Sequence, residues 1–200
     1  MSWVPSSLKK LIEVLKKLPG IGDRSAFRIS YHILKDKNLM TELIDSLKET
    51  SERITLCKIC HGFSEDSDIC PICDDERRNS GVLCIVERPE DVFVLESVQG
   101  LNWKYHVLGG VLSPVKGITA EKLNIFDIRD RIKSENFKEI VMCLNPDIES
   151  EATISYLTSL LDDLDVTITR VAIGLPRGTD IALMDPFTLR ESLLGRRKLK

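Results

Sequence analysis

The sequence lacks the long apolar segments found in membrane and exported proteins. No stretch approaches the roughly 18 consecutive apolar residues that span a bilayer, and the first residues show no charged start followed by an apolar block. Internal repeats and low-complexity segments are also missing. These absences argue against a membrane-bound, secreted or repeat protein, and we expect a cytoplasmic chain with no membrane partner.

A strong net charge of either sign is missing as well. The 28 Lys and Arg against 31 Asp and Glu give a formal charge of −3. Residues 1–53 carry 10 basic and 7 acidic side chains, and the remainder carries 18 and 24. So small a basic excess is typical of solvated helix faces and does not by itself indicate a polyanionic partner. The 42 % hydrophobic content is enough for a folded core.

The pattern of apolar residues changes near residue 81. Before it, apolar residues recur at helical spacing in segments 8–18, 26–34 and 39–53. Pro19-Gly20 ends the first of these segments. After it, short apolar runs alternate with helical patterns, which predicts a parallel α/β domain. The expected strands are Val82–Val86, Tyr105–Leu108, Glu139–Leu144 and Val166–Ile173, and the expected helices are Asp91–Val98, Glu151–Leu164 and Pro186–Leu194.

Four of the six cysteines form two closely spaced pairs, Cys57-x-x-Cys60 and Cys70-x-x-Cys73. Two chelating pairs at this spacing suit one tetrahedral Zn²⁺ with no open coordination position, so we predict a structural zinc site. A redox motif or an iron–sulfur centre is the alternative. We expect His61 to be a surface residue outside the site, and the remaining thiols, of Cys84 and Cys143, to be buried in the core.

The segment Leu18-Pro19-Gly20-Ile21-Gly22-Asp23-Arg24 joins two predicted helices and resembles the helix-hairpin-helix motif of DNA-binding repair proteins. Gly20 and Gly22 permit positive φ and close approach, and the following helix N-terminus can bind a phosphate oxygen. Arg24 and Arg28 share a helix face and could flank the same phosphates. We therefore predict DNA contacts at these four residues. The alternative is an ordinary helical corner in which the glycines only make the turn.

Polar residues follow two of the predicted strands, Glu87 after the first and Asn145-Pro146-Asp147 after a later one. This arrangement resembles a Toprim domain, whose catalytic members hold Mg²⁺ with a strand-end Glu and an Asp-x-Asp pair. Asn145 stands at the first Asp position and carries no charge. We expect weak Mg²⁺ binding at most, at Glu87, Asp147 and Glu149, and no catalytic residues. A solvated strand-end carboxylate is the alternative for Glu87.

The three parts in this order, a helix-hairpin-helix, a four-Cys zinc site and a Toprim domain, resemble the RecR recombination mediator family over essentially the whole chain. Further matching segments are His106–Pro114, Glu149–Thr153, Gly174–Pro176 and Leu194–Arg197. We therefore expect a helix-hairpin-helix region at 1–53, a zinc finger at 54–80, a Toprim domain at 81–175 and a C-terminal segment at 176–200 that serves in oligomerisation.

What the resemblance implies is a DNA repair protein that forms a dimer or a tetrameric ring. It would clamp gapped DNA or single-strand/double-strand junctions, act with RecO or RecF, and help to load RecA on single-stranded DNA. The partner surface would comprise Glu87, Glu90 and Asp91. A ring would turn several weakly basic N-terminal faces towards one lumen, so that multivalency compensates for weak single sites.

Two other functions remain open from the sequence. An Mg²⁺-dependent nuclease or primase-like enzyme would use Glu87, Asp147 and Glu149, although Asn145 argues against it. A pure adaptor would bind proteins through the Toprim part and never touch DNA. Metal-dependent strand cleavage would favour the enzyme, and absent or salt-insensitive DNA binding would favour the adaptor.

Overall fold

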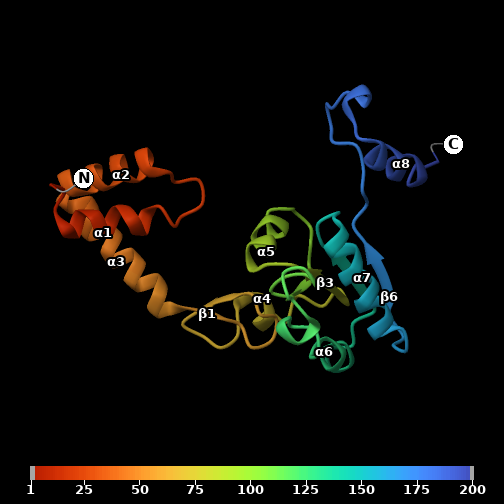
Figure 1. Cartoon of the computed structure of the whole chain (residues 1–200). Helices are drawn as coiled ribbons and strands as arrows, with labels where there is room; N and C mark the ends of the chain where they lie inside the picture. Colours follow the sequence, from red (N-terminus) through yellow and green to blue (C-terminus); the bar gives the residue numbers. More distant parts are fainter. Residues whose placement is uncertain (1–2, 199–200) are drawn as a thin grey trace. The chain divides into compact units, whose positions relative to one another are not determined.

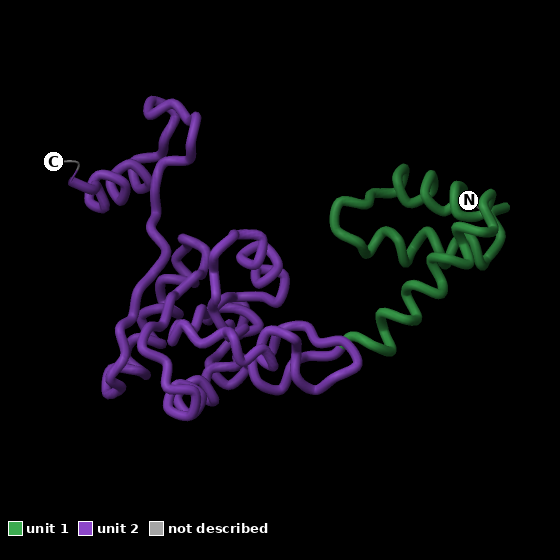
Figure 2. The backbone as a smooth tube through the Cα atoms, turned by 180° about the vertical axis from the view of Figure 1, so that it is seen from behind, with its two compact units in different colours: residues 1–54 green, residues 55–200 purple. Residues whose placement is uncertain are grey.

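The computed structural model describes residues 3–198. The chain divides into two compact units, one up to residue 54 and one from residue 55 onward, shown in green and purple in Figure 2. Each unit is described by itself.

The N-terminal unit consists of three helices, α1 (Ser6–Leu15), α2 (Asp23–Lys35) and α3 (Lys37–Arg53). Asp36 caps the N-terminus of α3, because its carboxylate accepts hydrogen bonds from the amides of Asn38 and Leu39 at 3.0 and 3.1 Å. Among the described residues of this unit only Ala26 and Ser30 are buried. The three helices therefore leave much of their apolar surface uncovered.

A small metal-ribbon lobe, residues 54–75, follows the helices. It contains β1 (Ile54–Leu56) and β2 (Phe63–Glu65), which pair in a two-stranded sheet, and the short helix α4 (Pro71–Asp74). The amide of Val107 donates a 2.8 Å hydrogen bond to the carbonyl oxygen of Cys60. This bond fixes the lobe to the edge strand of the larger sheet.

That sheet has four parallel strands in the order β4-β3-β5-β6. The register places Val86 of β3 opposite Val107 of β4 and Cys143 of β5, so these three strands end at the same level. This confirms the predicted α/β class with a parallel sheet. The strands are β3 (Val82–Val86), β4 (Lys104–Val107), β5 (Glu139–Cys143) and β6 (Thr167–Arg170).

Helices cover both faces of the sheet (Figure 1). Alternate residues of β3 point to opposite sides, Leu83 and Ile85 into one core and Cys84 and Val86 into the other. The first core is covered by α6 (Ile128–Glu135) and α7 (Ile148–Leu161), and the second by α5 (Pro89–Glu96). The remaining helical segments are η1 (Ala120–Lys122), η2 (Ile181–Leu183) and α8 (Pro186–Leu194).

Most predicted elements are present, with shifted ends. The strand at 82–86 and the helix at 186–194 have the expected bounds, whereas α7 begins three residues earlier than expected and β6 is shorter. Helix α6, strands β1 and β2 and helix α4 were not predicted. No helix in the described part of the chain is long and apolar enough to cross a membrane.

Candidate metal centre and nucleic-acid interface

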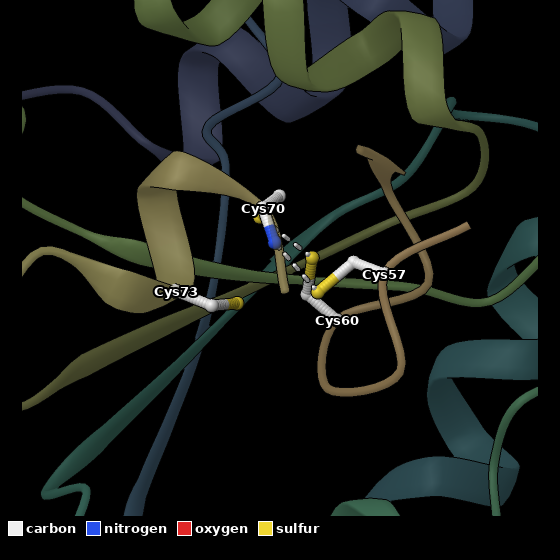
Figure 3. Close-up of side chains that lie close together, drawn as sticks. All are labelled: Cys57, Cys60, Cys70 and Cys73. Carbon is white, nitrogen blue, oxygen red and sulfur yellow. Dashed lines mark hydrogen bonds between the residues drawn. The ribbon is translucent and has the colours of Figure 1, made fainter. Parts of the chain in front are cut away.

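The four paired cysteines converge in the ribbon lobe. Their Sγ atoms all lie within 4.8 Å of one another, and all four residues are buried. Figure 3 shows the side chains of Cys57, Cys60, Cys70 and Cys73 turned towards a common centre. Four thiolates from two chelating pairs are the donor set of a closed structural zinc site. The residues therefore fit Zn²⁺, which would hold the lobe together and offers no position for a substrate.

The surroundings of the sulfurs favour negative charge at the site. The amides of Cys70 and Gly62 donate to Cys57 Sγ and Cys60 Sγ at 3.3 and 3.4 Å. Hydrogen bonds among the thiols lower the pKa of Cys70 and raise the pKa values of Cys60 and Cys73, so the first negative charge forms on Cys70. The guanidinium of Arg131 lies 3.9 Å from Cys73 Sγ. Backbone dipoles and one cation thus face the thiolates that a metal would need.

The other cysteines and His61 lie outside this cluster. Cys84 is fully buried and Cys143 is half-buried against the same core. His61 is not one of the clustered ligands, but it is only partly exposed and its Nε2 lies 2.7 Å from Asp127 Oδ2. The expectation of a plain surface residue at His61 therefore missed a contact with a segment 66 residues away.

The predicted hairpin lies between α1 and α2. Gly20 adopts a φ of +78°, in the left-handed region, whereas Gly22 has a φ of −87° and is the N-cap of α2. Only Gly20 therefore needs the conformational freedom of glycine. A Cβ built at either glycine would meet nothing within 4 Å, so the surface above both is open. Because Gly22 has no side chain, it leaves the start of α2 without a side-chain cap.

Arg24 and Arg28 are exposed on the first two turns of α2. Among the described residues neither guanidinium pairs with a carboxylate, whereas Lys16 is engaged with Asp23 at 2.8 Å. Together with Phe27, the two arginines line a hollow of about 570 Å³ on this unit. The structure thus brings the two predicted contact arginines and the glycine turn to one end of α2. An uncapped helix N-terminus flanked by exposed cations suits a phosphate oxygen.

The polar residues Glu87 and Asn145, which follow strands β3 and β5, contact each other at the edge of the four-stranded sheet. Glu87 is 9 % exposed, and its Oε2 accepts a 3.0 Å hydrogen bond from Asn145 Nδ2. Its other oxygen faces Arg88 Nε at 3.2 Å. Asn145 therefore presents its amide donor, rather than its carbonyl oxygen, to the carboxylate. This pairing satisfies Glu87 without a metal ion.

The remaining acidic groups of this edge are also occupied. Glu149 accepts from Ser113 Oγ at 2.6 Å and from Lys116 Nζ at 2.9 Å, and these bonds lower its pKa. The Asp147 carboxylate caps α7 through the amide of Ser150. In the described part of the chain Glu87, Asp147 and Glu149 do not form a cluster of converging metal-binding atoms. The Lys116 ammonium beside Glu149 and the Arg88 guanidinium beside Glu87 both bring positive charge to this edge.

The acidic residues predicted to bind a partner differ in exposure. Glu90 is exposed and lies 3.7 Å from the Arg88 guanidinium. Asp91 is half-buried because its carboxylate accepts from the Arg88 amide at 2.8 Å and so caps α5. Glu87 is nearly buried. Of the three, Glu90 is the most exposed, and another molecule could reach it by displacing only its contact with Arg88.

The residues missed by sequence reasoning are those that tie the ribbon lobe to the sheet. Arg131 is 6 % exposed, donates to the Tyr105 carbonyl oxygen at 2.6 Å and pairs with Glu135 at 2.7 Å. His106 is fully buried, and its Nε2 lies 2.7 Å from the carbonyl oxygen of Asn124. Isolated charged residues in a sequence carry no signal of such burial, because arginine is usually exposed.

Comparison with known proteins covers all three parts. Family models match residues 8–50 as the RecR helix-hairpin-helix, 54–75 as the RecR zinc finger domain of the four-cysteine type and 81–172 as a Toprim domain. The predicted motifs are thereby confirmed, and the four-cysteine cluster in particular supports zinc binding.

Full-length relatives carry the same name. "Recombination protein RecR" of Natranaerobius thermophilus is 40 % identical over 200 residues, all of both chains. Those of a Geobacter species and of Bifidobacterium adolescentis are also 40 % identical, over 96 % of this chain and 97 and 96 % of theirs. These names are those of a recombination protein and not of an enzyme. The chain contains the helix-hairpin-helix, the zinc finger and the Toprim domain, and it is 40 % identical to its relatives over essentially its full length. It therefore belongs to the RecR family of DNA recombination and repair proteins.

Proposed function

We propose that this chain is a recombination mediator that clamps gapped DNA and brings partner proteins to it without cutting the strands. The observation that carries the proposal is the open end of α2, where the exposed Arg24 and Arg28 lie beside a helix start capped only by Gly22. Such a surface contacts phosphates and reads no base, which suits a protein that must act at any sequence.

Self-association is the second part of the proposal. Large apolar side chains of the N-terminal unit are exposed: Val14, Leu18, Phe27, Tyr31, Leu34, Leu43, Ile44 and Leu47. So much apolar surface on a unit with so small a core indicates that another surface covers it. A dimer or tetrameric ring of this chain would do so, and it would also repeat the pair Arg24 and Arg28 around the DNA. The C-terminal segment 176–200 would contribute to assembly.

The Toprim-like part would recruit partners. We propose that Glu90 and Asp91, with Glu87 behind them, face RecO or RecF, and that the assembly helps RecA to load on single-stranded DNA. The support is the location of these acidic groups at one sheet edge. The working division is then 1–53 for DNA, 54–80 for zinc, 81–175 for partners and 176–200 for assembly.

Mg²⁺ binding at Glu87, Asp147 and Glu149 would be weak. Each carboxylate already has a protein partner, and Lys116 would have to withdraw from Glu149 before a dication could enter. Mg²⁺ also requires near-octahedral oxygen coordination, and carboxylates that are already engaged in these contacts do not supply it. The nuclease or primase-like alternative gains no support from this edge.

The test is a titration of labelled gapped duplex with the purified protein, followed by fluorescence anisotropy over a salt series with Mg²⁺ present. Wild type is compared with Arg24→Ala/Arg28→Ala and with Lys37→Ala/Lys48→Ala. The control pair removes two exposed charges from α3, and neither lysine lines the arginine hollow.

The proposal expects salt-sensitive binding, lost in the arginine variant and largely kept in the control, with intact strands. Cleaved strands would make the protein an enzyme, and absent or salt-insensitive binding would leave the adaptor.

A further inference from the structure

A second group of metal-binding side chains lies beside the four-cysteine site. His61 from the ribbon lobe, His106 in β4 and Asp127 before α6 bring one ligand atom each to within 4.8 Å of the others. They come from three separate segments, and none of them is a ligand in the cysteine cluster. We propose that His61, His106 and Asp127 form a second, weaker site for a divalent first-row transition metal such as Zn²⁺.

The distances suit such an ion. Asp127 Oδ2 lies 2.7 Å from His61 Nε2, and Oδ1 lies 3.7 Å from His106 Nε2. Ligand atoms around a tetrahedral Zn²⁺ with bonds near 2.0–2.1 Å are about 3.3 Å apart, between these two values. The imidazole rings are 5.2 Å apart in an edge-to-face arrangement with an interplanar angle of 80°, and the Nε2 atom of each ring lies near an oxygen of the Asp127 carboxylate. Small rotations would equalise the distances.

The donor chemistry also suits this class of ion. Two imidazoles and one carboxylate form the protein part of an open transition-metal site, with water in the remaining position. His106 is fully buried, which disfavours a charged ring, and the neutral imidazole is the form that ligates a metal. Asp127 is 48 % exposed, which leaves solvent access for the ion and its water.

The backbone at His61 is consistent with a selected geometry. His61 has a φ of +59°, a left-handed conformation that costs a non-glycine residue roughly 1 kcal/mol or more. In this conformation His61 Nε2 lies 2.7 Å from Asp127 Oδ2. Four thiolates around Zn²⁺ carry a net charge of −2, and that charge attracts a second cation to a neighbouring site.

Two features keep the site weaker than the cysteine site. His106 Nε2 lies 2.7 Å from the Asn124 carbonyl oxygen, so an ion must replace the proton on Nε2, and that proton moves to Nδ1. Arg131 Nη1 lies 3.5 Å from Nδ1 and must turn further towards its shorter bond with the Tyr105 carbonyl oxygen. The second site therefore binds its ion only after the four thiolates have bound Zn²⁺.

The test is a metal titration of the full chain already carrying one Zn²⁺ on its cysteines. Zn²⁺ is added at pH 7.5 in competition with a chromophoric chelator, and bound metal per chain is measured. The variants His61→Asn and Asp127→Asn remove one ligand each, and His32→Asn is the control because His32 is exposed on α2 of the other unit. Wild type and His32→Asn should take up a second ion, and both ligand variants should bind it at least about 100-fold more weakly.

Histidine ¹⁵N spectra provide a readout that a purely structural role would not change. On Zn²⁺ addition the Nε2 signals of His61 and His106 should shift to values of metal-bound nitrogen, and the signal of His32 should not. Retention of the first Zn²⁺ by a variant shows that its ribbon lobe is folded. If His61→Asn loses that ion, Asp127→Asn carries the test. Saturation of wild type at one ion, or equal uptake of the second by wild type and Asp127→Asn, would overturn the proposal.

Discussion

Replacement of Arg131 by methionine should destabilise the second unit strongly, because this buried arginine connects three parts of it. It donates to the Tyr105 carbonyl oxygen on β4, pairs with Glu135 on its own helix and lies against Cys73 of the ribbon lobe. Methionine fills a similar volume but supplies no donor. The loss therefore falls on hydrogen bonds and charge pairing and not on packing.

The size of the effect follows from what is left unpaired. Removing one partner of a buried ion pair costs about 3–5 kcal/mol in general. Here Glu135 keeps a second cation, Lys104 Nζ at 2.7 Å, and remains 23 % exposed. We therefore expect the lower end, about 3 kcal/mol of unfolding free energy. For a unit of this size that corresponds to a fall in Tm of about 6–12 °C.

The assay is thermal unfolding at saturating Zn²⁺, followed by circular dichroism. Arg129→Met is the matched control, two residues away on α6. Arg129 is 28 % exposed, pairs with the more exposed Asp163 at 2.6 Å and also donates to the Leu160 carbonyl oxygen. Because solvent screens this pair, Arg129→Met should lower the Tm less than Arg131→Met does. A fall in Tm that is equal for the two variants, or below about 3 °C for Arg131→Met, would refute the assignment of Arg131 as a stabilising connection.

Three other predictions concern separate groups. Glu96→Gln should lower the urea midpoint near pH 7 and much less near pH 3. The Arg78 hydrogen bond lowers the pKa of Glu96, so its stabilisation is full above the ordinary value of 4.5 and is lost as the pH falls through the lower folded value. Cys57→Ser should lose zinc and speed the amide hydrogen exchange of residues 55–75. Lys116→Ala should raise the Mg²⁺ affinity seen by calorimetry, because Glu149 then lacks its cation.

Each of these has a contrary outcome. A midpoint difference for Glu96→Gln that is the same at both pH values would remove the proposed linkage. A folded, correctly assembled Cys57→Ser chain without zinc would show that the metal is not structural. Unchanged Mg²⁺ affinity in Lys116→Ala would mean that Asn145, and not the lysine, keeps the dication away from this edge.

Regular elements with a clear period could be predicted from the sequence. The run Val82–Val86 is apolar throughout because helices cover both faces of its strand, and that pattern needs no tertiary information. Helix α6 was missed because it is short and mostly polar, and one of its arginines is buried. The start of α7 was placed too late because the Asp147 cap, which fixes it, resembles an ordinary loop aspartate.

The candidate sites divide in the same way. Cys57 and its three partners can be recognised by their spacing, and the glycine turn by its composition. His61, His106 and Asp127 stand 45 and 21 residues apart, with no spacing rule that links them. Only the docking of the ribbon on β4 brings them together. The Lys116 contact with Glu149 likewise depends on a loop geometry that residue types do not encode.

The hydrogen bond between the Val107 amide and the Cys60 carbonyl has a consequence for solubility. Strand β4 is one of the two outermost strands of the sheet, and its free side would present unpaired backbone groups to other chains. The ribbon lobe covers part of that side, through the bond from the Val107 amide to the Cys60 carbonyl oxygen. A chain stripped of zinc therefore loses more than a small lobe, because it uncovers a template on which a second chain can add a strand, and metal depletion would first appear as aggregation.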